Sequence, residues 1–363
     1  MDVLSEIRNH IAFITLNRPA ALNALTLDMI RRLRTLLEEC AADPQVFAVL
    51  IRGAGDRAFC AGGDIRALYQ SYKNSTSLHR EFFAAEYPVD HWLYHYPKPH
   101  VLILDGITLG GGMGIAQGST LRIVGERTRM AMPEVAIGFF PDVGGSYFLS
   151  RLEGALGIYL ALTGVQIRGA DALYCRLADA YLPPSAIAAL PDDLTALRWS
   201  EDHHADLTAF LRERSAPGLA AGPLRALRAG IDSHFSQSTV PAILASLESE
   251  SRGAFAEWAH ASAKLMRSRS PTMLSVTLRQ LQRGARMSLA DCFRMELGMA
   301  AHSFEQGDFL EGVRAVLIDK DNAPRWQPGC IEEVTDAMIE AFFRERWTSA
   351  AHPLATLGQP FSV

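Results

Sequence analysis

Short apolar segments that end in glycine-rich sequence constrain the fold of this chain most. Phe47–Arg52 stops at Gly53, and His100–Asp105 stops at Gly106. β-branched and apolar runs of this length, bounded by glycine, are typical of strands. The segments predicted as strands are Ile11–Leu16, Phe47–Arg52, His100–Asp105, Leu121–Val124 and Met130–Met132. An amphipathic helix is predicted over residues 27–42, capped by Thr26. This alternation favours an α/β fold with a mostly parallel sheet and helices outside it.

The second half of the chain has a different composition. After Pro183-Pro184 the sequence becomes rich in Ala, Leu, Arg and Glu up to about residue 300, which indicates helices. At about 150 residues per domain, 363 residues are enough for two regions. We therefore predict a core over residues 1–190 and a mainly helical C-terminal region over residues 191–363 that packs on the core.

Composition and charge exclude several classes of partner. The chain has 35 basic and 40 acidic residues, a net charge of −5, so nucleic acid is not an expected partner. The five cysteines are scattered without a CxxC pair, which indicates free thiols and no zinc site. The N-terminus has no signal or transit pattern, and no apolar run reaches about 18 residues. We expect a cytoplasmic protein without a membrane partner.

Three glycine-rich segments follow the predicted strands. They are FCAGGDIR (59–66), GITLGGGMGIAQG (106–118) and MPEVAIGFFPDVGG (132–145). Glycines between a strand and a helix expose backbone N–H groups at the positive end of the helix dipole. Two such sites together can form an oxyanion hole, although triple glycine also marks tight turns and close helix packing. Because GxGxxG, GxxxxGK[ST] and GxSxG are all missing, dinucleotide, P-loop and serine-hydrolase sites are disfavoured.

The third segment contains two carboxylates in apolar surroundings. Glu134 and Asp142 lie eight residues apart among Met132, Ile137 and Phe139. Partial burial raises the pKa of a carboxyl group, which suits acid–base work near neutral pH. The alternative interpretation is that Glu134 caps a helix and Asp142 bonds loop amides.

These three segments, in this order and spacing, resemble the crotonase (enoyl-CoA hydratase/isomerase) superfamily. The similarity runs from about residue 8 to about residue 328 and is greatest to the 3-hydroxyisobutyryl-CoA hydrolase branch. MPEVAIGFFPDVGGSYFLSRL resembles the third motif of that branch. SPTMLSVTLRQL (270–281) and DFLEGVRAVLIDKDNAPRW (308–326) resemble its C-terminal part.

The resemblance implies a spiral of ββα units that binds an acyl-CoA thioester. Gly63 and Gly111 would supply the two oxyanion N–H groups. Glu134 matches the catalytic glutamate, Asp142 matches the aspartate of the hydrolases, and Glu86 matches a substrate-contacting glutamate. Glu86 could instead be a solvated charge on a helix. Coenzyme A would be part of the substrate, no metal or other cofactor is expected, and a homo-oligomer is possible.

The expected reaction is hydrolysis of a short-chain 3-hydroxyacyl-CoA, best matched by 3-hydroxyisobutyryl-CoA, an intermediate of valine catabolism. Two-glutamate hydratases of the superfamily carry their first catalytic Glu where this chain has Gly114, and a small residue where it has Asp142. Both departures favour hydrolysis. Two alternatives stay open: an enoyl-CoA hydratase or isomerase that uses Glu134 alone, and a non-catalytic acyl-CoA-binding protein.

Other residues are weaker candidates. Cys60 beside the first glycine loop could be a nucleophile, but a packed side chain is favoured because no base lies near it in the sequence. His91, His95 and His100 have metal-like spacing without an acidic or cysteine partner. A stripe of arginines could contact CoA phosphates, although a solvated helix face is the simpler expectation. The stripe consists of Arg279, Arg283 and Arg286.

Overall fold

The computed structural model describes residues 1–215 and 219–359 and contains two sheets. The six-stranded sheet has the order β1-β2-β3-β5-β7-β10, and all its neighbouring strands are parallel except β1 and β2. Its strands are β1 (Val3–Arg8), β2 (Ile11–Leu16), β3 (Ala48–Gly53), β5 (His100–Leu104), β7 (Leu121–Val124) and β10 (Ala180–Tyr181).

The second sheet is built from the short strands that follow β3, β5 and β7. Its order is β4-β6-β8-β9, in which β4, β6 and β8 run parallel and β9 runs antiparallel to β8. Its strands are β4 (Ala58–Cys60), β6 (Ile107–Leu109), β8 (Arg129–Ala131) and β9 (Ile167–Arg168). Each turn of the chain therefore gives one strand to each sheet, which confirms the predicted spiral of ββα units.

The first helices connect and cover these strands. They are α1 (Leu27–Ala42), α2 (Ile65–Lys73), α3 (Leu78–Leu93), α4 (Gly111–Gln117), α5 (Gly145–Phe148), α6 (Leu156–Thr163) and α7 (Gly169–Tyr174). The predicted cap of α1 is confirmed, because Thr26 Oγ1 accepts a hydrogen bond from the Met29 N–H at 3.2 Å. Strands β2 and β7 and helix α1 occupy the predicted residues.

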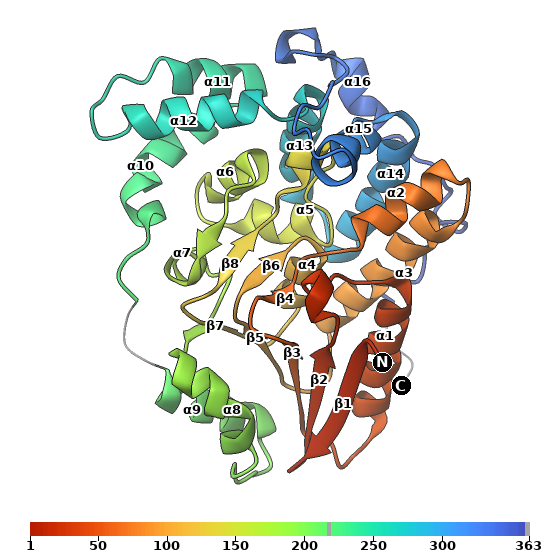
Figure 1. Ribbon diagram of the computed structural model, residues 1–363, viewed down its shortest axis with the longest axis vertical. Helices are drawn as coiled ribbons and strands as arrows, with labels where there is room; N and C mark the ends of the chain where they lie inside the picture. The colour runs from red at the N-terminus through yellow and green to blue at the C-terminus, as the bar shows by residue number, and fades with distance from the viewer. Residues whose placement is uncertain (216–218, 360–363) are drawn as a thin grey trace.

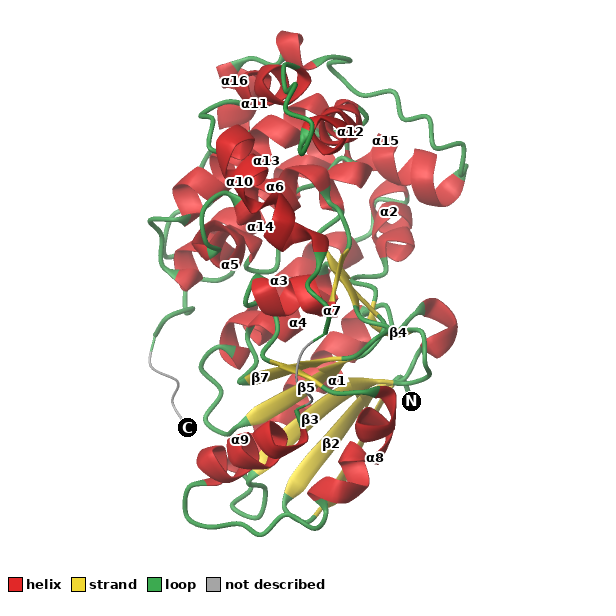
Figure 2. Ribbon diagram, turned by 90° about the vertical axis from the view of Figure 1, so that its left-hand side faces the viewer, coloured by secondary structure: helices red, strands yellow, loops and turns green. Residues whose placement is uncertain are grey.

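The large sheet is buried on both faces. Side chains of β2 alternate between them: Ile14 packs in the main core, whereas Ile11 and Phe13 pack in a second, smaller core. Helices α8 (Pro184–Leu194) and α9 (His203–Arg214) cover this second core, on the side of the sheet opposite the other helices (Figure 2). The predicted boundary at residue 190 falls inside α8, which packs on the sheet of the first region.

The C-terminal region is helical, as predicted. Figure 1 shows α14 (Leu289–Gln306) and α15 (Phe309–Val313) beside α3 and α2, so this part of the chain returns to the core. None of the helices in the described ranges has the length and apolar composition that a bilayer crossing needs. The helices are α10 (Pro223–Phe235), α11 (Val240–Glu248), α12 (Ala256–Arg267), α13 (Pro271–Gly284), α14 (Leu289–Gln306), α15 (Phe309–Val313) and α16 (Asp336–Ala341).

Candidate functional site

Two glycine loops touch where the two sheets meet the helices. Gly62 follows β4 with a φ of +93°, a conformation that favours glycine. A Cβ atom on Gly62 would lie 3.4 Å from the Gly111 nitrogen and 3.6 Å from the Gly110 Cα. The loop after β4 and the loop before α4 therefore meet through backbone atoms, an approach that larger side chains would prevent.

The predicted oxyanion donors, Gly63 and Gly111, lie at this meeting point. The Leu25 N–H donates to the Gly62 carbonyl at 2.8 Å and the Asp64 N–H donates to the Leu25 carbonyl at 2.9 Å. These two bonds flank Gly63 and leave its own N–H without an acceptor among the described residues. Gly111 is the first residue of α4, where an N–H has no partner within the helix.

Glu134 lies beside the same loop. It begins a short 3₁₀ helix (Glu134–Ile137) that follows β8. A Cβ atom on Gly110, whose φ is +48°, would lie 2.9 Å from Glu134 Oε1. The side chain is buried, and Oε2 has no hydrogen-bond partner in the described part of the chain. The residue before it, Pro133, is the N-cap of this helix and forms no side-chain cap bond.

Asp142 is held in the same buried region by a tyrosine. The Tyr87 hydroxyl, from α3, donates to Asp142 Oδ2 at 2.8 Å. Burial raises the pKa of Asp142 to about 7, whereas the bond from Tyr87 works in the opposite direction by favouring the carboxylate. Asp142 can therefore change its charge near neutral pH.

The loop that carries Asp142 is held by the C-terminal helices. Glu296 on α14 accepts hydrogen bonds from the Gly144 N–H at 2.8 Å and the Ser146 N–H at 2.9 Å. Gln280 on α13 donates to the Pro141 carbonyl at 2.6 Å. Neither residue was predicted as a site residue, although Gln280 lies in the segment 270–281 singled out above. A buried polar residue within an apolar helix is the only signal they give, and nothing in the sequence shows which loop such a residue meets.

Glu86 and Asp90 project from α3 onto the glycine face of α4. Glu86 Oε1 lies too close to the Cβ position of Gly111 for a side chain to fit there, and Asp90 Oδ2 lies 2.8 Å from the corresponding position on Gly114. Glu86 is 3% exposed and Asp90 is 0% exposed. The structure thus brings the predicted Glu86 to Gly111 and excludes its interpretation as a solvated charge. Asp90 was missed.

We call the buried acids of this site the carboxyl cluster. Its members are Glu86, Asp90, Glu134, Asp142 and Glu296. None of them forms an ion pair with a described residue. Burial raises the pKa of every member, to about 8 for Glu296, and mutual repulsion raises those of Glu86, Asp90 and Glu134 further. A charge on one of these acids therefore disfavours a charge on its neighbours.

Aromatic side chains from both halves of the chain wall the cluster. Phe139 lies 5.0 Å from Phe309 on α15 and 5.9 Å from Phe83 on α3, measured between ring centroids. Gly138, with a φ of +68°, packs against the backbone of Asp308. The C-terminal segment singled out in the sequence, residues 308–326, therefore begins at the wall of the site.

The remaining sequence candidates lie elsewhere or are inert. Cys60 is buried, its pKa is raised to about 12 by that burial, and its Sγ accepts from the Gly62 N–H at 3.4 Å. A thiol in this state is a poor nucleophile. Burial lowers the pKa of His91 and of His100 to about 4. Residues 1–215 and 219–359 contain no group of three side chains suited to a metal ion.

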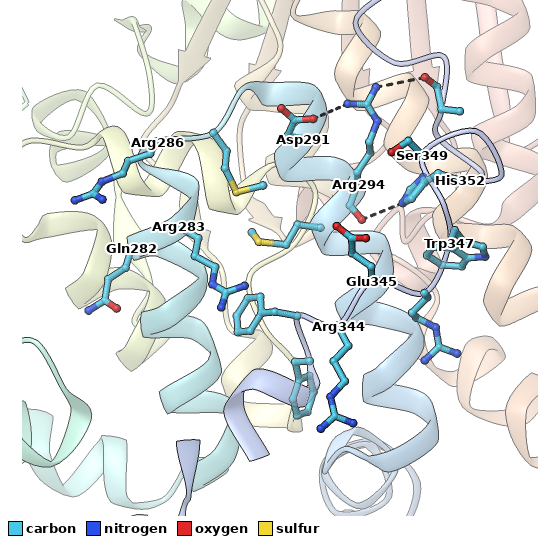
Figure 3. A pocket seen from close by; sticks show the side chains of 17 residues that line it. Gln282, Arg283, Arg286, Asp291, Arg294, Arg344, Glu345, Trp347, Ser349 and His352 are labelled. Atoms are coloured by element: carbon cyan, nitrogen blue, oxygen red, sulfur yellow. Dashed lines mark hydrogen bonds and ion pairs between the residues drawn. The ribbon is translucent and has the colours of Figure 1, made fainter. Parts of the chain in front are cut away.

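A separate cavity of about 1000 Å³ lies between α13, α14 and the segment after α16. We call it the arginine cavity. Figure 3 shows its arginines on different walls, with Arg294 bonded to Asp291. Two members of the arginine stripe, Arg283 and Arg286, line it, whereas Arg279 pairs with Glu340 and Asp336. The arginines on its walls are Arg283, Arg286, Arg294, Arg344 and Arg346.

Comparison with known proteins identifies the family of this fold and site. Residues 11–343 match the family described as enoyl-CoA hydratase/isomerase. The mitochondrial 3-hydroxyisobutyryl-CoA hydrolase of Xenopus laevis is 42% identical over 332 residues, which cover 91% of this chain and 85% of that protein. The human protein of the same name is 39% identical over 350 residues, covering 96% and 90%.

Solved structures share the fold under other names. A structure titled as a carnitinyl-CoA dehydratase from Mycobacterium thermoresistibile is 39% identical, has a TM-score of 0.88 and covers 99% of both chains. One titled as an enoyl-CoA hydratase from Rhodobacter sphaeroides is 36% identical, has a TM-score of 0.83 and covers 94% of this chain and 97% of that one. The fold, the profile match and the curated relatives agree: this chain belongs to the enoyl-CoA hydratase/isomerase family, the crotonase superfamily.

Proposed function

We propose that this protein is an acyl-CoA thioester hydrolase that converts 3-hydroxyisobutyryl-CoA to 3-hydroxyisobutyrate and CoA. The observation that carries the proposal is the position of Glu134 beside Gly110, in the loop that leads to Gly111 and meets the loop of Gly63. One Glu134 carboxylate oxygen and the N–H groups of Gly63 and Gly111 have no partner among the described residues. Curated relatives that share about 40% identity over most of the chain are named as hydrolases of this thioester.

Each residue has a role at the thioester carbonyl. The N–H groups of Gly63 and Gly111 bind the oxygen and stabilise the negative charge that develops on it. Glu134 acts at the carbonyl carbon, either as a general base on water or as a nucleophile that forms a mixed anhydride. Asp142 orients the substrate hydroxyl or the attacking water, and Glu86 contacts the substrate beside Gly111.

The two routes through Glu134 differ in where water oxygen first appears. A single turnover in oxygen-18 water places label in the Glu134 carboxyl if a mixed anhydride is cleaved at that group. Label confined to the product acid is expected from the general-base route and from a mixed anhydride cleaved at its acyl carbon, so it excludes only cleavage at Glu134. Neither route calls for a metal or a redox cofactor.

Hydration of an enoyl-CoA is the second candidate, because two similar structures carry hydratase or dehydratase titles. The space around Gly114 argues against it. A Cβ atom there would lie 2.6 Å from the Val143 Cβ and 2.8 Å from Asp90 Oδ2, so the catalytic glutamate expected at this position in two-glutamate hydratases has no room.

A two-substrate assay separates the candidates. With 3-hydroxyisobutyryl-CoA, hydrolysis releases free thiol, which a thiol reagent detects. With crotonyl-CoA, a hydratase removes the ultraviolet absorbance of the enoyl thioester without releasing thiol. We expect thiol release from the hydroxyacyl substrate. Enoyl loss without thiol release would establish the hydratase, and CoA-ester binding without turnover would establish a binding protein.

Cellular location and assembly stay predictions. The relatives named above are mitochondrial proteins, so they give no support to the expected cytoplasmic location. A homo-oligomer is expected from the superfamily resemblance, and gel filtration with light scattering tests it.

A further inference from the structure

A row of two buried polar side chains and one half-buried one lies along the seam between α3 and α4. Glu86, Asp90 and Tyr94 are four residues apart, so they share one face of α3 and its C-terminal end. They face Gly111, Gly114 and Gly118, which share one face of α4. A Cβ atom on Gly118 would lie 3.2 Å from Tyr94 Cδ2. The glycines give the three polar side chains room along the seam.

Each member of the row has a polar atom with no partner in the described residues. These atoms are Glu86 Oε1, both carboxylate oxygens of Asp90 and the Tyr94 hydroxyl. Asp90 is fully buried. An unsatisfied buried polar group destabilises the folded state, so four such atoms along one seam indicate bound water or a function.

The row connects the carboxyl cluster to a more exposed part of the molecule. At its inner end, Glu86 lies beside Gly111 and interacts electrostatically with Glu134 and Asp142. At its outer end, Tyr94 is half-buried and interacts electrostatically with Arg122. The Arg122 side chain is 15% exposed and pairs at 2.8 Å with Asp179, which is 30% exposed.

Thioester hydrolysis requires a proton to leave this buried site. The water oxygen bonds to the carbonyl carbon, and the carbon–sulfur bond breaks with its electron pair going to sulfur. Sulfur keeps one water proton, because a thiol has a pKa of about 8.5, whereas the product acid ionises with a pKa of about 4. One proton is therefore released per turnover. On the side of Phe139 the aromatic rings of Phe83 and Phe309 offer this proton no acceptor.

We propose that Glu86, Asp90 and Tyr94, with waters between them, form the path by which this proton leaves the site, and that Asp90 is its central relay. Asp90 accepts a proton from the side of Glu86 as it passes one to the side of Tyr94, so its own protonation state is restored. The titratable groups that interact electrostatically with Asp90 are Glu86 on α3, Tyr94 at the end of α3, Cys60 on β4, Asp142 in its loop and Glu296 on α14. Asp90 is thus a positioning and relay residue, distinct from the groups that touch the substrate.

Substitution of Asp90 tests the path through rate and chemical rescue. Asp90→Asn keeps the shape of the side chain but removes the acid, so we expect kcat for thiol release to fall about tenfold while KM changes less than about twofold. The solvent deuterium isotope effect on kcat should rise, because proton exit becomes slow. Asp90→Ala leaves space in which formate can take the place of the carboxyl. Added formate should raise kcat of this variant at least about threefold.

A matched control and a second variant sharpen the result. Asp171 is also buried, and it accepts a hydrogen bond from the Leu224 N–H at 3.0 Å outside this seam, so Asp171→Asn should leave kcat and the isotope effect unchanged. Tyr94→Phe should lower kcat about threefold. Unchanged kcat in Asp90→Asn, or a loss in Asp90→Ala that formate does not restore, would overturn the proposal and leave Asp90 as a packing residue.

The proposal rests on thioester hydrolysis, and infrared spectroscopy separates the two. A protonated Asp90 carboxyl gives a carbonyl band in the wild-type protein at neutral pH that disappears in Asp90→Asn, whether or not any substrate is turned over. If thiol release fails but the band is present, the proposed hydrolysis is wrong. If the band is absent, Asp90 is ionised and the relay is wrong.

Discussion

The carboxyl cluster and the arginine cavity differ in how they hold ionisable side chains. In the cluster, five acids are buried without an ion pair, and the carboxylate oxygens of Asp90 and one oxygen each of Glu86 and Glu134 have no partner in the described chain. In the cavity, charges are exposed or paired: Arg283 pairs with Glu340, and Arg346 pairs with Glu305.

The difference shows where the chemistry is expected. Paired surface arginines already donate hydrogen bonds to acids of the protein, and such exposed ion pairs contribute little to its stability. Buried acids without partners raise the free energy of the folded state, and they persist where substrate or water supplies the missing partners. We therefore expect the reaction at the buried acids of the carboxyl cluster and not in the arginine cavity.

Among the variants proposed here, Glu134→Gln should have the largest effect on catalysis. The amide can neither attack the carbonyl nor accept a proton from water, so we expect kcat for thiol release to fall at least about 1000-fold. Binding of a CoA ester, measured by calorimetry, should stay within about threefold of wild type. Near-normal turnover would remove the cluster from the mechanism.

Glu296→Gln should mainly affect stability. An amide offers one acceptor oxygen to the two N–H donors of Gly144 and Ser146, so one of them loses its partner. We expect a loss of about 2 kcal/mol in unfolding free energy and a fall of about 3 °C in Tm by calorimetry.

Glu248→Gln is the matched control for this loss. Glu248 is 42% exposed and paired with Arg267, and its replacement should change Tm by less than about 1 °C. Equal shifts in the two variants would mean that α14 does not hold the Asp142 loop.

Tyr87→Phe should move the pH profile. The hydroxyl favours the ionised form of Asp142, so its loss raises the pKa of Asp142 above about 7. The inflection that Asp142 gives in kcat/KM should shift to higher pH by about half a unit. Tyr96→Phe, which removes a hydroxyl bonded to the Leu37 carbonyl, is the control. An unchanged inflection, or a shift to lower pH, contradicts this electrostatic account.

Arg286→Ala should have the smallest effect. Arg286 lines the arginine cavity, away from the carboxyl cluster. Its loss should leave kcat/KM for 3-hydroxyisobutyryl-CoA within about twofold of wild type at low and high salt. A fall of more than about tenfold would place part of the acyl-CoA in the cavity and end the contrast drawn above.

Much of the fold could be predicted because apolar periodicity and the residues that begin and end helices and strands are local features of the sequence. Strand β2 and helix α1 follow from apolar runs and the Thr26 cap. Strand β1 was missed because its sequence, VLSEIR, is largely exposed at the edge of the sheet. Strands β4 and β6 have three residues each and merge with the glycine segments that follow them.

The site was predictable only where its residues lie in short motifs. Gly63, Gly111, Glu134 and Asp142 stand in three such segments, and the superfamily resemblance assigned their roles. Glu296 bonds to Gly144 and Ser146, which precede it by 152 and 150 residues in the sequence. Such a contact depends on helix packing, which no sequence spacing reveals. Asp90 looks like an ordinary polar residue of α3 until the glycine face of α4 is seen against it.

The position of oxygen-18 in the product tests the central claim most directly, that the buried acids add water to a thioester carbonyl. The protein is incubated with 3-hydroxyisobutyryl-CoA in oxygen-18 water, and the acid product is analysed by mass spectrometry. We expect free CoA and an acid labelled in its carboxylate, with its hydroxyl oxygen unlabelled. Label at the hydroxyl-bearing carbon, with the thioester intact, would show exchange by dehydration and rehydration and would contradict the account.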